Sequence, residues 1–149
     1  MAARTEDLTR ALANTAPDIV HFSGHGSDEG EGIYLEDGQG DAKLVSGKAL
    51  ASVFGSFERR PRVVVLNACF TPAQAKAIVE HVAYVIGTRR DIGDDTAMAF
   101  SVGFYQALGA GRTIEEAFQL GCAQIRLEGI PEHRVPVLLT RQGTRKTCA

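Results

Sequence analysis

The stretch Asp18-Ile-Val-His-Phe-Ser-Gly-His-Gly26 decides how this chain is organised. An apolar strand over residues 18–23 runs into two glycines that bracket His25, and no helical pattern takes over after them. A second apolar run, Arg62-Val-Val-Val-Leu-Asn67, is typical of a parallel strand buried on both faces, and Cys69 follows it. In open parallel sheets the site lies beyond the carboxyl ends of the strands. If the two strands are neighbours in the sheet, we expect His25 and Cys69 to face one crevice.

The remaining pattern alternates strands with helices and predicts an α/β layer fold with a mainly parallel sheet and helices on both faces. Period-two alternation around a glycine-rich turn predicts a β-hairpin after the first core strand. Pro136 cannot donate to a strand ladder, which places the last strand at a sheet edge. The expected strands are 18–23, the hairpin strands 33–35 and 42–44, and strands 62–67, 82–86 and 135–139. The expected helices run from Thr5 to before Pro17, from after Ser46 to Gly55, from Pro72 with Thr71 as its cap, from Asp94 to Gly109, and onward from Thr113.

Length and composition indicate one globular domain over residues 1–140, followed by a polar tail over 141–149. The chain has 149 residues, 44% of them hydrophobic and 23% charged, with a net charge of −2. This balance argues against a nucleic-acid-binding surface, and no apolar run is long enough for a membrane helix or a signal peptide. The three cysteines are far apart and form no CxxC pair. The sequence therefore predicts no disulfide framework and a cytoplasmic location.

Cys69 and His25 have the chemistry of a catalytic dyad. Only a thiolate attacks, and the helix expected from Pro72 would favour that form through its positive amino end. His25 would act as general base and then protonate the leaving amine. Gly24 and Gly26 allow a substrate backbone to approach closely, and the amides of Gly26 and Cys69 could form an oxyanion hole. This chemistry needs no metal or cofactor.

Each of these residues also has an ordinary interpretation. His25 could be a loop histidine, and Cys69 could be a small buried hydrophobic residue. His21 lies inside the strand and is expected to pack or hydrogen-bond rather than react. A zinc site built from His21, His25 and Cys69 is disfavoured, because a strand and a turn do not bring both rings to one face as a helix would. A dinucleotide site at Gly24-His-Gly26 is disfavoured because no helix follows.

The two motifs together resemble the CHAT family of caspase-like cysteine peptidases. His-Phe-Ser-Gly-His-Gly follows one strand, Val-Val-Leu-Asn-Ala-Cys closes the next, and the later run from Tyr84 to Gly111 is also similar to that family. The resemblance implies a caspase-like three-layer sandwich, endopeptidase activity on protein or peptide substrates, and a dyad at His25 and Cys69. It further implies a role in bacterial signalling or defence beside a regulatory sensor domain or partner chain. The family's usual first strand has no counterpart ahead of Thr5.

Substrate preference depends on the loop after the third core strand. Asp94 and Asp95 would lie at the same sheet edge, and the resemblance implies that an acidic pocket selects a basic residue before the cut. One of the two could instead cap the helix. Arg89 and Arg90 would favour an acidic residue. We expect a preference for basic or small residues.

Two further interpretations stay open. The chain could be an inactive peptidase-like module that binds partners or scaffolds an effector complex. Alternatively, the peptidase could be latent until a sensor domain or partner orders the loops at 27–31 and 88–95.

Overall fold

The structure is a computed structural model that describes residues 18–23, 32–36, 39, 41–58, 60–69, 72–88, 93–143 and 145–148. The expected helix after Thr5, the cap at Thr71, and the residues from Gly24 to Gly30 lie outside these ranges. The elements in chain order are β1 (Ile19–Ser23), β2 (Gly32–Glu36), β3 (Ala42–Ser46), α2 (Gly47–Gly55), β4 (Val63–Cys69), α3 (Pro72–Val79), β5 (Tyr84–Thr88), α4 (Asp94–Gly109), α5 (Ile114–Leu127), β6 (Pro136–Thr140) and β7 (Arg145–Thr147).

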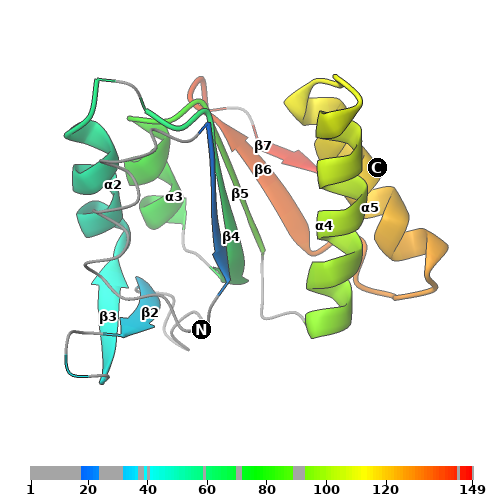
Figure 1. Ribbon diagram of the computed structural model, residues 1–149, viewed down its shortest axis with the longest axis horizontal. Coiled ribbons are helices and arrows are strands. Elements are labelled where there is room, and N and C mark those ends of the chain that lie inside the picture. Colours follow the sequence, from blue (N-terminus) through cyan, green and yellow to red (C-terminus); the bar gives the residue numbers. More distant parts are fainter. Residues whose placement is uncertain are drawn as a thin grey trace.

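The described elements form three layers, in which one sheet lies between two layers of helices (Figure 1). The strand order is β1-β4-β5-β6-β7; β1, β4 and β5 are parallel, and β6 and β7 are antiparallel to their neighbours. Helices α2 and α3 cover one face of the sheet and α4 and α5 the other (Figure 1). The β2–β3 hairpin is a separate two-stranded sheet. The expected caspase-like α/β sandwich, with helices on both faces and a hairpin after the first core strand, is confirmed.

Strand β4 shows why a continuous apolar run forms a central strand. Val63 and Val65 point into the core beneath α4 and α5, whereas Val64 and Leu66 point into the core beneath α2 and α3. All four are at most 2% exposed, so each face of the strand must be hydrophobic.

Helices α4 and α5 pack against each other at two glycines. A Cβ atom at Gly103 would meet the backbone of Leu120, and one at Gly121 would meet the ring of Phe100. The absent side chains therefore set how closely the two backbones approach. Within the described residues, no helix combines the length and the apolar character needed to cross a membrane.

Two helix starts follow the capping rules read from the sequence. The Ser46 hydroxyl accepts a hydrogen bond from the Ala49 amide at 3.1 Å and caps α2. The Thr113 hydroxyl accepts one from the Glu116 amide at 3.1 Å and caps α5. Helix α4 ends at Gly109, the residue predicted to stop it.

The carboxyl-terminal strands differ from expectation. Strand β6 lies between β5 and β7, so its predicted place at the sheet edge is wrong. Strand β7 pairs only with residues Val137 to Leu139, so the nitrogen of Pro136 lies beyond that ladder and no β6–β7 hydrogen bond is lost. Strand β7 lies within residues 141–149, which were interpreted as a polar tail. The sequence did not indicate this strand because its three side chains are exposed and form no apolar pattern.

Cys122 of α5 and Cys148 after β7 form a disulfide, with their Cα atoms 5.6 Å apart. Both residues belong to the core beneath α4 and α5. The sequence analysis expected no disulfide framework and did not foresee this one bond. The cysteine spacing gave no hint of the bond because the two residues are 26 positions apart and meet only when β7 joins the sheet. The cysteines therefore no longer support the expected cytoplasmic location, which rested on the lack of a disulfide framework.

Candidate active site

The predicted site lies at the edge where the parallel strands end. Strands β1 and β4 run in the same direction and finish together in the lower part of Figure 1. Helix α4 also begins at that end of the molecule. Groups placed just after β1 and β4, and at the start of α4, therefore share one edge of the sheet.

The register between β1 and β4 brings the two motifs level with each other. The last paired residues are Ser23 and Asn67. His25 stands two residues after Ser23, and Cys69 stands two residues after Asn67. Paired strands are about 5 Å apart. The expected meeting of His25 and Cys69 depended on these two strands being neighbours, and the structure shows that they are. His25, Gly24 and Gly26 themselves lie outside the described residues.

Cys69 is the last residue of β4, two residues further along this strand than the sequence indicated. It is in register with Thr88 of β5, and the pairing of these strands shifts between Val65 and Cys69. Such irregularities re-aim side chains and are common next to active sites. Helix α3 begins at Pro72, so its amino end follows Cys69 closely in the chain, as predicted. The structure describes the backbone of Cys69 and not its side chain.

Asp94 and Asp95 lie in the first turn of α4, and both are exposed. The residue at the N-cap is Gly93, so neither aspartate caps the helix. Both carboxylates therefore remain accessible to solvent at the edge where β1 and β4 end. The turn is held in place by the buried Thr96, whose hydroxyl donates to Glu132 Oε1 at 2.8 Å. Whether the aspartates contact a substrate stays a prediction.

His21 has the non-catalytic role that the sequence indicated. Its Nδ1 atom lies 2.7 Å from the Tyr105 hydroxyl, and the two rings stack with centroids 5.8 Å apart. Desolvation lowers the pKa of His21 and raises the pKa of Tyr105. The contact joins β1 to α4 and so ties together two elements that meet the candidate site.

Thr88 was expected to begin the loop over residues 88–95, and it is the last residue of β5. It is 5% exposed, and its hydroxyl has no hydrogen-bond partner in the described part of the chain. Burying a hydroxyl without a hydrogen-bond partner costs free energy, so a ligand that binds beside Thr88 could supply the missing partner. No sequence signal could have identified Thr88, because its isolation depends on the packing of β5 against its neighbours.

Comparison with known proteins gives two matches. The sequence pattern of the CHAT domain family matches residues 1–132. A Roc-COR-CHAT protease from an unknown prokaryotic organism is 23% identical in an alignment of 151 positions that covers 93% of this chain. The chain spans only 14% of that relative's length.

Proposed function

Because the chain belongs to the CHAT domain family, we propose that it is a caspase-like cysteine endopeptidase whose dyad is Cys69 and His25. One observation carries this proposal: β1 and β4 are parallel neighbours whose last paired residues, Ser23 and Asn67, each precede a dyad residue by two positions. A histidine and a cysteine that each follow the last paired residue of two adjacent parallel strands by two positions would meet the first requirement of a nucleophile and its base. The protease name of the relative is consistent with the proposal.

In the proposed reaction the Cys69 sulfur attacks the carbonyl carbon of the scissile peptide bond. His25 takes the thiol proton and later gives it to the leaving amine, which leaves an acyl group on the sulfur as a thioester. Water, deprotonated by His25, then hydrolyses the thioester and restores the thiol. The amino end of α3 favours the thiolate before attack. The amides of Gly26 and Cys69 would stabilise the oxyanion of each tetrahedral intermediate.

The substrate proposal rests on the acidic first turn of α4. Asp94 and Asp95 are exposed carboxylates at the end of the molecule where β1 and β4 finish (Figure 1), so they favour a basic residue before the scissile bond. Arg89 and Arg90 precede them in the chain and would favour an acidic residue if they lined the pocket instead. Cleavage of matched peptides with Arg, Ala or Asp at that position separates the two.

The wider role we propose is that of an effector in bacterial signalling or defence. The relative is much longer than this chain, so a sensor domain or a partner chain is the expected source of regulation. Such a partner would raise the basal activity of the chain by ordering the loops around the site.

Labelling with a peptide carrying a thiol-reactive group tests the dyad. Cys122 and Cys148 are bonded to each other, so Cys69 is the single remaining cysteine of the three and should take up one equivalent. His25→Ala should slow the modification of Cys69 sharply, because it removes the base. His81→Ala is the matched control, since His81 follows α3 rather than β1, and it should leave the rate unchanged. Equal labelling rates in both variants would favour an inactive binding module.

A further inference from the structure

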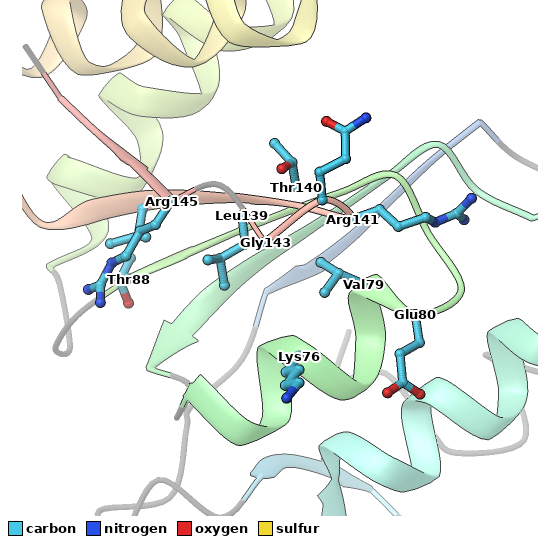
Figure 2. Close-up of a pocket in the computed structure, with 11 residues that line it drawn as sticks. Lys76, Val79, Glu80, Thr88, Leu139, Thr140, Arg141, Gly143 and Arg145 are labelled. Atoms are coloured by element: carbon cyan, nitrogen blue, oxygen red, sulfur yellow. The ribbon is translucent and has the colours of Figure 1, made fainter.

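A groove with a volume of about 770 Å³ lies between α3 and the β6–β7 end of the sheet. One wall of the groove is formed by α3 and the residue after it, and the other by β6 with the turn that follows it (Figure 2). The residues that line it are Lys76, Val79, Glu80, Thr88, Val137, Leu139, Thr140, Arg141, Gln142, Gly143 and Arg145. No described helix lies over β7 on this face of the sheet (Figure 1).

The groove runs the length of β5 and β6. Thr88 stands at the carboxyl end of β5, in register with Cys69. At the other end Thr140 pairs with Tyr84, the first residue of β5. A five-residue strand such as β6 is about 17 Å long. The groove is therefore long enough for an extended peptide of about five residues, and one of its ends adjoins the strand that carries the proposed nucleophile.

The floor of the groove is apolar and its rim is charged. Val79, Val137 and Leu139 supply aliphatic surface. Three cationic side chains stand at the rim against the single carboxylate of Glu80, and all four are exposed; the cations are Lys76, Arg141 and Arg145. This combination complements a chain in which leucine-like side chains alternate with carboxylates, because successive side chains of an extended peptide point to opposite sides.

The buried hydroxyl of Thr88 gives an independent indication that the groove binds a ligand. The Thr88 side chain lines the groove, is 5% exposed, and has no hydrogen-bond partner among the described residues. A peptide backbone carbonyl or carboxylate at that end of the groove would accept the hydrogen bond that the hydroxyl lacks.

We propose that this groove is an exosite that binds an acidic, leucine-rich segment of the protein substrate in extended form. The proposal rests on the proposed peptidase function, because the occupant is assigned to the substrate on the grounds that the groove begins beside Cys69. Carboxylates of the segment contact Arg141 and Arg145 at the rim, and its apolar side chains cover Leu139. Binding there holds the substrate near the nucleophile and raises the efficiency with which an acidic protein is cut.

Fluorescence anisotropy tests the groove without using catalysis. The probe is fluorescein-labelled Leu-Glu-Leu-Asp-Leu, and the protein is the full chain carrying Cys69→Ala. We expect saturable binding, with much weaker binding of Leu-Gln-Leu-Asn-Leu and of Gly-Glu-Gly-Asp-Gly, because the site needs both charge and apolar surface. The double variant R141Q/R145Q should bind the probe about tenfold more weakly, and Thr88→Val about threefold more weakly.

The matched control is R112Q/R134Q, which removes two exposed arginines that do not line the groove and changes the net charge equally. It should leave the affinity unchanged. Equal loss of binding in both double variants would overturn the proposal, since net charge alone would explain it. No binding of the probe, or unchanged affinity in both R141Q/R145Q and Thr88→Val, would also overturn it.

A competition assay tests the assignment to the substrate. Unlabelled Leu-Glu-Leu-Asp-Leu should inhibit cleavage of casein, an acidic unfolded protein, by the chain with Cys69 intact, and R141Q/R145Q should be inhibited about tenfold less well. Binding without inhibition would overturn the substrate assignment. If casein is not cleaved at all, the peptidase proposal fails and the substrate assignment with it, whereas the anisotropy result still reports separately on the groove.

Discussion

The substitution Gly103→Ala tests how closely α4 and α5 must pack. Gly103 lies in the middle of α4, where an alanine would ordinarily stabilise a helix by about 1 kcal/mol. In this structure the added Cβ atom would meet the carbonyl oxygen of Leu120 and lie 2.9 Å from the Cβ atom of Gln124. Neither contact can be relieved by rotating a flexible side-chain end, because one atom is backbone and the other is bonded directly to it.

The expected cost follows from the movement that the new atom forces. The helices must separate at this point, and overpacking of this kind typically costs about 1–3 kcal/mol. Separation would also loosen the nearby contact of Gly121 with the ring of Phe100, where a Cβ atom would lie 2.6 Å from Cε2. The gain in helix propensity offsets part of this cost. We expect a net loss of about 1 kcal/mol, which corresponds to a fall in Tm of roughly 2–4 °C for a chain of this size.

Thermal and urea unfolding, followed by circular dichroism, measure this effect. The matched control is Gly109→Ala at the end of the same helix, where an added Cβ atom would have nothing within 4 Å. It should be neutral, or stabilising by up to about 1 kcal/mol. If Gly103→Ala is as stable as Gly109→Ala, the close approach of the two helices is wrong and the reasoning fails.

Three further predictions concern the elements around the site. The Cys122–Cys148 disulfide closes a loop of 26 residues, so its reduction should lower the unfolding free energy by about 3.5 kcal/mol. Thermal unfolding with and without a reductant measures this loss. The Cys148→Ser variant should have the same Tm in both conditions. His21→Asn removes the hydrogen bond to Tyr105 and should cost about 1 kcal/mol at neutral pH. The pKa of His21 is lowered in the folded chain, so as the pH falls the unfolded chain takes up the proton of this histidine first. The difference in unfolding free energy between the unsubstituted chain and His21→Asn should therefore shrink as the pH falls below 6.5. A difference that grows would contradict the assigned desolvation. Thr113→Ala removes the cap of α5 and should cost about 1 kcal/mol in urea unfolding, whereas Thr113→Ser should cost little.

Much of the fold could be predicted because local chemistry and tertiary structure agree. The valines of β4 are buried on both faces, so their continuous apolar run predicts a central strand. Ser46 and Thr113 cap helices where their side chains can reach the first free amides. The sequence indicated that β1 and β4 belong to a mainly parallel sheet, whereas their direct pairing and its register became known only from the structure.

The errors occur where tertiary contacts decide the structure. Val82 is fully buried and was expected to begin a strand, but it lies in the turn before β5, because burial does not require a strand ladder. Strand β7 is polar and exposed and forms through pairing with β6. The groove could not be predicted either, since it combines residues of α3 with residues of β6 and β7 that no sequence pattern connects.

Hydrolysis of a protein substrate tests the central proposal most directly. Casein cleavage should be compared for the unsubstituted chain, Cys69→Ala and His25→Ala, with circular dichroism used to verify that each variant is folded. We predict that the unsubstituted chain cuts casein, that Cys69→Ala abolishes cleavage because the nucleophile is gone, and that His25→Ala reduces it at least a hundredfold. Cleavage by the folded Cys69→Ala variant at the rate of the unsubstituted chain would contradict the dyad.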